Sequence, residues 1–279
     1  TASPIVTIGD NVAEHKAILG ALLNGSTTEY GDGFVFGDGD AAAVNGNTLV
    51  VYEDQNTASQ VNRLFGGGNE AGVTGTATVN MNQGKVNAGI FGGCNTQGTV
   101  GGAIEVNVMG GTLGIEGTPM AKGIFGGGYG ESTATTSNVV VNVGDATHAP
   151  TLYADVYGGS ALGKVNTDET TTEKTQINSA KGTIHGNLYG GGLGQASPAI
   201  SAIVNGNVAV NLGKDKTGTT IEGSTIYGSV FGANNVLGTP KGSVTVNHYK
   251  GTLDSIFGGG NQADYVPRDA TSAYPAVKP

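Results

Sequence analysis

A short hydrophobic pattern recurs from one end of the chain to the other: an aliphatic residue, an aromatic residue, and then glycine. It first occurs at Val35-Phe36-Gly37 and returns in longer form at Leu64-Phe65-Gly66-Gly67-Gly68. The aromatic position is occupied in turn by Phe36, Phe65, Phe91, Phe125, Tyr157, Tyr189, Phe231 and Phe257. They recur at intervals of roughly 26 to 42 residues, a period typical of solenoids, propellers and repeat arrays. We expect the rings to form an internal stack and the glycines after them to turn the chain at positive φ.

A second repeated pattern has the period of two that a β-strand requires. Its polar member is an asparagine between apolar residues, as in Val106-Asn107-Val108 and Val141-Asn142-Val143. Successive side chains of a strand point to opposite faces, so the apolar neighbours should face inward and the asparagine outward. The pattern therefore predicts a surface ladder made of Asn80, Asn107, Asn142, Asn178, Asn211 and Asn247.

A third pattern lies between each asparagine and the next aromatic residue. It is a turn residue followed by a β-branched or aliphatic pair, as in Gly111-Thr112-Leu113 and Gly182-Thr183-Ile184. Three short strands per repeat fit one coil of a parallel β-helix, whereas a propeller blade needs four antiparallel strands in about 40–45 residues. We predict an all-β parallel β-helix, a solenoid of about seven to eight coils, over residues 34–262.

Residues 1–33 precede the repeats and contain the one convincing helix pattern, from about Val12 to Leu23. Asn11, with Glu14 three residues later, forms a capping box, and Gly25 is a plausible stop. A solenoid must shield the ends of its core with atypical terminal units. We interpret the helix as an N-terminal cap, and a partner-binding helix is the alternative.

Residues 263–279 follow the repeats and read as an extended tail without a recognisable cap. An uncapped solenoid end is a template for head-to-tail contact, and an extended segment can complete a neighbour by strand addition. The residues we expect to take part in assembly are Ile5, Val6 and Ile8 near the N-terminus and Tyr265, Val266, Tyr274 and Val277 in the tail.

Composition narrows the classes of partner. The net charge is −9 without any basic cluster, which disfavours nucleic acid and anionic membrane surfaces. No apolar run reaches the ~18 residues of a membrane span. The single Cys94 excludes an intrachain disulfide framework and a cysteine-rich metal site. A chain that begins with Thr1 fits a processed, secreted protein, or equally a piece cut from a longer one.

The Ile-Phe-Gly-Gly-Gly-Asn phrase at 256–261, together with the Val-Asn-Val phrases, resembles the glycine-rich repeats of large bacterial surface proteins. The resemblance covers residues 34–262. It implies a right-handed parallel β-helix of the pectin-lyase-like kind. Such helices occur in adhesins, fibres, autotransporter passengers and polysaccharide lyases, so the fold alone does not choose an activity.

Candidate chemistry is sparse. A β-helix that cleaves polysaccharides needs clustered acids on one outer face, and Glu105 and Asp155 are the candidates. Neither has an acid at the equivalent position of an adjacent repeat. Asp32, Asp38 and Asp40, with glycines between them, form a candidate calcium site, and an acidic turn is the alternative.

We therefore expect a non-enzymatic, secreted or cell-surface structural or adhesive protein, such as a self-associating subunit of an extracellular fibre. We expect no cofactor apart from the candidate calcium. One alternative is a carbohydrate lyase or hydrolase that works near Glu105 and Asp155. Another is a glycan-binding adhesin that uses the long loops at 163–175 and 193–206.

Overall fold

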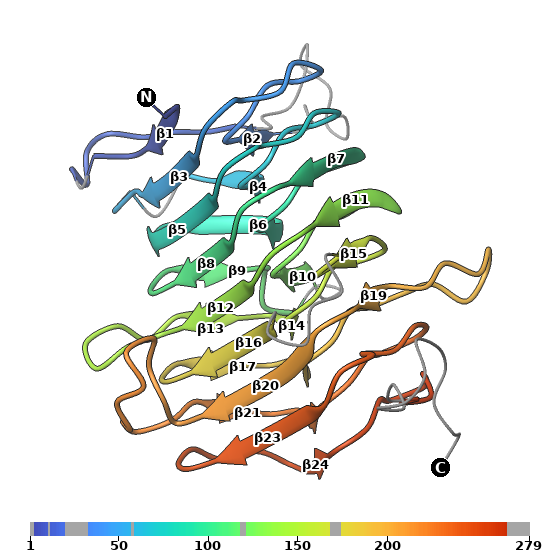
Figure 1. The fold of residues 1–279 in the computed structure, drawn as a ribbon. Helices are drawn as coiled ribbons and strands as arrows, with labels where there is room; N and C mark the ends of the chain where they lie inside the picture. The colour runs from blue at the N-terminus through green and yellow to red at the C-terminus, as the bar shows by residue number, and fades with distance from the viewer. Residues whose placement is uncertain are drawn as a thin grey trace.

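The computed structural model describes residues 3–10, 12–19, 33–56, 59–117, 121–167 and 174–266. Over these residues the protein is all-β. Its strands form three sheets in which every registered pair is parallel. Figure 1 shows the strands stacked along one axis, from β1 at the blue end to β23 and β24 at the red end. This arrangement confirms the predicted all-β, parallel class and is consistent with a β-solenoid.

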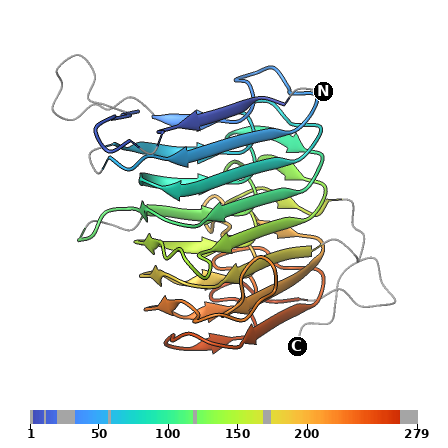
Figure 2. The same cartoon turned by 90° about the vertical axis from the view of Figure 1, so that its left-hand side faces the viewer.

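The first sheet contains the Val-Asn-Val phrases. Its eight strands, in spatial order, are β1 (Ile5–Ile8), β3 (Thr48–Glu53), β5 (Ala77–Gln83), β8 (Ile104–Val108), β12 (Val139–Val143), β16 (Lys174–Ser179), β20 (Asn207–Leu212) and β23 (Val244–His248). Neighbours in space are one repeat apart in sequence, so equivalent residues lie side by side: Val106 pairs with Val141, and Asn107 with Asn142. Figure 2 shows the same regular succession from another side.

The second sheet has twelve strands in two ladders that share β6. The aromatic ladder consists of β2 (Phe34–Phe36), β4 (Val61–Phe65), β6 (Lys85–Phe91), β10 (Ala121–Phe125), β14 (Ala154–Tyr157), β18 (Leu188–Tyr189), β22 (Val230–Phe231) and β24 (Ile256–Phe257). The other ladder continues from β6 through β9 (Thr112–Leu113), β13 (Thr151–Leu152), β17 (Thr183–Ile184) and β21 (Thr225–Ile226). β6 joins them because its first residues pair with β9 and its last with β10.

The third sheet was not expected from the sequence. Its strands are β7 (Gln97–Val100), β11 (Ser132–Thr135), β15 (Lys164–Val165) and β19 (Ile203–Val204). They share no repeated phrase. What they share is one buried column, formed by Val100, Thr135, Val165 and Val204. A single inward position per repeat, once filled by threonine, is too weak a pattern to mark a strand.

The predicted N-terminal helix is wrong for residues 12–19, and residues 11 and 20–32 lie outside the described part of the chain. Ile18 forms a parallel bridge with Gln60, and the Leu19 N–H donates to the Gln60 carbonyl at 2.9 Å. Leu19 also packs against the main core. A short isolated helix is marginal in water, so pairing with the next repeat outweighs the local pattern.

The hydrophobic interior consists of two clusters. Aliphatic side chains from all three sheets, such as Val141, Ile124 and Val165, form the main core. The aromatic residues form a separate cluster. Ile124 and Phe125 are adjacent in one strand, so their side chains point to opposite faces of it. The expected ring stack therefore lies outside the main core.

The glycines after the aromatic residues serve close approach rather than positive φ. A methyl group on Gly126 would collide with the carbonyl oxygen of Gly158 in the next repeat, and Gly158 stands in the same relation to Gly190. None of these three has a positive φ. Positive φ occurs at glycines elsewhere in the repeats, among them the turn before the Thr-Leu type of pair, as at Gly111 (φ 78°) and Gly182 (φ 115°).

Candidate functional site at the ends of the stack

The aromatic residues form one continuous stack of eight rings. Consecutive centroids lie between 4.6 Å and 5.1 Å apart, and consecutive rings are tilted by 1° to 15°. The interior rings, such as Phe91 and Phe125, are buried between their neighbours. The terminal rings differ: Phe36 is half-buried, and Phe257 is 48% exposed. The stack thus presents an aromatic ring at each end.

The six asparagines of the first sheet are joined by hydrogen bonds into an amide ladder. Each Nδ2 donates to the Oδ1 of the preceding repeat at 2.8–3.0 Å, from Asn247 back to Asn80. The ladder is not solvated as a surface ladder would be, because Asn107, Asn142 and Asn178 are buried. Each lies between the amides above and below it, and Glu105 and Gln176 flank them on the same face. The ladder leaves Asn247 Oδ1 as its last acceptor.

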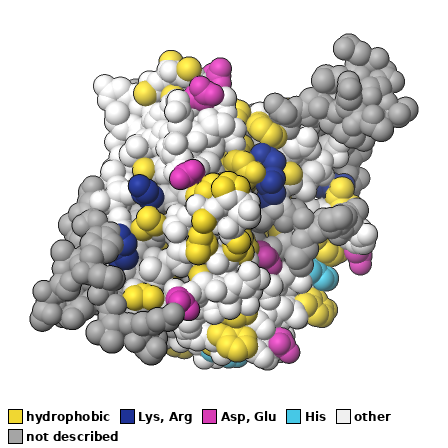
Figure 3. Space-filling view, turned by 90° about the vertical axis from the view of Figure 1, so that its right-hand side faces the viewer, with side chains coloured by type: hydrophobic (Ala, Val, Ile, Leu, Met, Phe, Trp, Pro, Cys, Tyr) yellow, Lys and Arg dark blue, Asp and Glu magenta, His cyan; other side chains and the backbone are white. Residues whose placement is uncertain are grey.

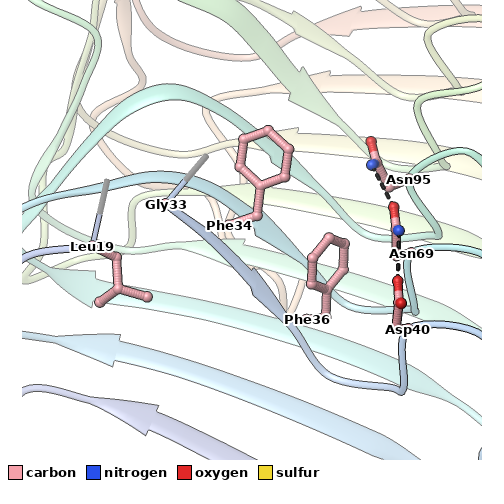
Figure 4. Close-up of a pocket in the computed structure, with 7 residues that line it drawn as sticks. All are labelled: Leu19, Gly33, Phe34, Phe36, Asp40, Asn69 and Asn95. Carbon is pink, nitrogen blue, oxygen red and sulfur yellow. Dashed lines mark hydrogen bonds between the residues drawn. The ribbon is translucent and has the colours of Figure 1, made fainter. Parts of the chain in front are cut away.

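A pocket of about 510 Å³ lies at the N-terminal end of the ring stack (Figure 4). Leu19, Phe34 and Phe36 supply its apolar side. Its polar side is a short column in which Asn95 Nδ2 donates to Asn69 Oδ1 at 2.8 Å and Asn69 Nδ2 donates to Asp40 Oδ1 at 2.7 Å. The open ring of Phe36 therefore borders a recess with hydrogen-bonding groups.

The C-terminal end of the stack presents unpaired apolar surface. In β24, Ile256 is 43% exposed and Phe257 is 48% exposed, although the equivalent Val230 and Phe231 are buried one repeat earlier. The glycine turn is open at this end as well. A methyl group on Gly258 would meet nothing within 4 Å, whereas a methyl group on the equivalent Gly232 would meet the Gly258 carbonyl oxygen.

The residues expected to take part in assembly divide between the two ends. Ile5 is 63% exposed, whereas Val6 and Ile8 pack against the main core. Tyr265 Oη donates to the Gly242 carbonyl at 2.9 Å, and the Val266 N–H donates to Thr239 Oγ1 at 3.0 Å. Tyr274 and Val277 lie outside the described residues.

Of the three candidate calcium residues, the structure describes Asp38 and Asp40. Asp38 Oδ1 accepts the Gly39 N–H at 2.6 Å, and burial raises the pKa of the Asp38 carboxyl. Asp40 is engaged with Asn69 in the pocket, and Asp32 lies outside the described residues. Within the described ranges, no three His, Cys, Asp or Glu side chains are grouped so as to hold a metal ion.

The candidate catalytic acids lie on different sheets. Glu105 is in β8, where its Oε1 is 3.4 Å from Asn142 Nδ2. Asp155 is in β14, where it accepts from Tyr157 Oη at 3.0 Å and from the Asn187 N–H at 2.7 Å. Burial raises the pKa of Asp155. Burial and the charge of Asp155 also raise the pKa of Tyr189 to about 12. Asp155 is therefore held by hydrogen bonds to two residues of the aromatic side of the repeats.

Two loops were proposed from the sequence as glycan-binding surfaces. The 163–175 loop contains β15, and its residues 168–173 lie outside the described part of the chain. The 193–206 loop contains β19 and an antiparallel bridge between Gln195 and Ile200.

On the face shown in Figure 3, hydrophobic side chains gather near the centre and basic side chains are scattered.

A second, partly exposed ring column was missed from the sequence. Tyr153 stacks on His185 at 4.4 Å, and His185 on Tyr227 at 4.9 Å. The pattern that would have found it is an aromatic or imidazole ring directly after the aliphatic residue of three successive Thr-Leu or Thr-Ile pairs.

No family model, curated protein or solved structure matches this chain. The described residues also contain no helix of the length and hydropathy needed to cross a bilayer.

Proposed function

We propose that this chain is a non-enzymatic, secreted or cell-surface structural protein that associates with itself, as a fibre subunit does. The proposed fold is a right-handed parallel β-helix, like that of the bacterial glycine-rich repeat proteins that the sequence resembles. The observation that carries the proposal is that the ring stack passes through every repeat and ends in a partly exposed ring on each side.

Two further observations favour a structural role. The amide ladder and the ring stack connect each repeat to the next, so that repeats stabilise one another as in other solenoids. In addition, the two candidate acids are hydrogen-bonded within different sheets and do not form a pair. The asparagines of the amide ladder and the rings of the stack thus join each repeat to the next.

Sedimentation velocity over a wide range of protein concentration tests this proposal. A self-associating subunit should show a weight-average sedimentation coefficient that rises with concentration, because association follows mass action. A chain that sediments as a monomer at every concentration, including about 500 µM, contradicts the proposal.

A second candidate function, glycan binding, is favoured by the chemistry of the N-terminal pocket. An aromatic ring beside a carboxylate and an amide can stack on a sugar ring and bind its hydroxyls. Saturation-transfer NMR with methyl glucoside, galactoside and mannoside tests it. Saturable transfer that disappears in Phe36→Ala supports this candidate, and no transfer from any of the three opposes it.

A further inference from the structure

The last repeat has a free edge in the glycine turn as well as an exposed ring. In the preceding repeats, the amide after the aromatic residue donates to the aromatic carbonyl of the next repeat. The Gly126 N–H donates to the Tyr157 carbonyl at 3.0 Å, and the Gly232 N–H to the Phe257 carbonyl at 2.8 Å. The equivalent Gly258 N–H has no such acceptor in the described part of the chain. Within the described residues, the edge beyond β24 therefore lacks the aromatic strand that every earlier repeat has beside it.

The first repeat offers the matching elements. Phe36 stacks on Phe65, and Phe34 packs edge-on against Phe36 with the ring centroids 6.2 Å apart. Among the described residues no second ring stacks face-to-face on Phe36, and the pocket lies beside it. Over the described ranges, the β1 strand pairs only with β3 and is the outermost strand of the first sheet. A further repeat on the N-terminal side would cover both the ring of Phe36 and the outer edge of β1.

The register of the sheets defines how the two ends fit together. Following the pairs from strand to strand places Ile5 in the column of Thr245, Val6 in that of Val246, Thr7 in that of Asn247 and Ile8 in that of His248. In the aromatic ladder, Val35 and Phe36 share columns with Ile256 and Phe257. Core-facing positions at one end thus correspond to core-facing positions at the other. In this register the apolar side chains of both ends lie on the same face of the continued sheet.

We infer that the partner of the C-terminal edge is the N-terminal repeat of a second copy of this chain, with β23 beside β1 and β24 beside β2. The inference rests on the proposed self-association and specifies its contact. Phe257 stacks on Phe36 of the second copy, and Thr7 of that copy donates its hydroxyl to Asn247 Oδ1. The contact joins two different surfaces and adds each copy along the axis on which the strands already stack, so it repeats without closing into a ring and gives a filament.

A methyl group on Gly258 provides a specific test. By analogy with Gly126 and Gly232, this methyl group would collide in the assembly with the Gly37 carbonyl of the second copy. In the isolated chain it would meet nothing, so Gly258→Ala should leave the thermal midpoint unchanged. We expect sedimentation velocity to show association weakened about tenfold or more. Association equal to that of the unmodified chain contradicts the inferred contact but leaves self-association standing.

Disulfide trapping tests the register independently. A mixture of Ile5→Cys and Thr245→Cys should form a mixed disulfide, because adjacent strands lie about 4.8 Å apart and a disulfide spans about 4.4–6.8 Å between Cα atoms. Val6→Cys mixed with Thr245→Cys is the matched control, because the two thiols face opposite sides of the sheet. The native Cys94 is buried. Equal yields from the two mixtures contradict the register, whereas a chain that never associates contradicts both proposals.

Discussion

At the scale of the residue, the stacking of repeats places each polar side chain beside the equivalent side chain of the neighbouring repeat, so that the two can form a hydrogen bond. Asn142 Nδ2 donates to Asn107 Oδ1 at 2.8 Å, and its Oδ1 accepts from Asn178 Nδ2 at 2.8 Å. A buried polar group without a partner costs about 1–3 kcal/mol. The ladder therefore requires an amide, which both donates and accepts, at each interior position.

Asn142→Asp should destabilise the fold strongly. A carboxylate at this buried position cannot donate to Asn107 Oδ1 and adds an unpaired charge, so we expect a loss of about 3 kcal/mol or more. The matched control is Asn247→Asp at the half-buried end of the ladder, with an expected loss of about 1 kcal/mol. Urea denaturation followed by circular dichroism measures both. Equal losses would show that burial in the ladder does not set the cost.

The pH dependence of stability should carry a contribution from Asp155. Burial raises its pKa in the folded state above the ordinary 3.8, so the folded state binds this proton more tightly than the unfolded state does. Acidification from neutral pH through the raised pKa towards 3.8 should therefore stabilise the unmodified chain relative to Asp155→Asn. Urea midpoints of both proteins at several pH values in this window test the sign. A midpoint difference that does not change with pH contradicts it.

At the scale of the element, the sequence predicted strands where a column of like residues marked them. The Val-Asn-Val phrase of β12 and the Ile-Phe phrase of β10 show their repeat directly, so the first sheet and the aromatic ladder could be predicted. The third sheet could not, because β11 and β15 share only one buried position. The helix predicted near the N-terminus is wrong for residues 12–19, because the bridge from Ile18 to Gln60 is a long-range contact with no local sequence signature.

The candidate site was only partly visible in the sequence for the same reason. The terminal rings Phe36 and Phe257 belong to the repeated phrase and were identified in advance. The pocket beside Phe36 also needs Leu19 and Asn95, which come from the segment before the first aromatic strand and from a later turn. No local pattern connects these residues. The pairing of repeats brings them together.

Gly126→Ala should destabilise the glycine turn severely. The added methyl group would overlap the Gly158 carbonyl oxygen and a methyl group of Val139, so we expect a loss of about 3 kcal/mol or failure to fold. Gly258→Ala is the same substitution at the equivalent position of the last repeat, where it meets nothing within 4 Å. Thermal denaturation of both variants measures the contrast. A mild effect at Gly126 would contradict the close approach of the repeats.

At the scale of the whole molecule, a net charge of −9 means that copies repel one another at long range. The inferred end contact consists of apolar side chains and hydrogen bonds, so salt should act mainly by screening this repulsion. Raising ionic strength from about 0.01 M to about 0.15 M shortens the Debye length from about 30 Å to about 8 Å. Sedimentation velocity should therefore show stronger association at the higher salt. Weaker association would point to a contact made by ion pairs.

At one position of the inferred contact two hydrogen-bond acceptors would face each other, so a substitution that supplies a donor there should strengthen the association. Asp40 ends the polar column of the pocket, and in the filament it would face Asn261 Oδ1 of the neighbouring copy, so that two acceptors meet. Asp40→Asn supplies a donor and should tighten association by about tenfold. Asp10→Asn removes the same charge at a residue bonded to His15 rather than in the column. Equal gains in the two variants would assign the effect to charge alone.

Negative-stain electron microscopy of the unmodified chain, at high concentration and about 0.15 M salt, tests the central claim most directly. The claim is that repeats continue in register from one copy into the next. The account predicts unbranched filaments with the width of a single stack, which are fewer and shorter in Gly258→Ala at the same concentration. Separate particles of one stack length in the unmodified chain, or filaments as many and as long in Gly258→Ala, would contradict it.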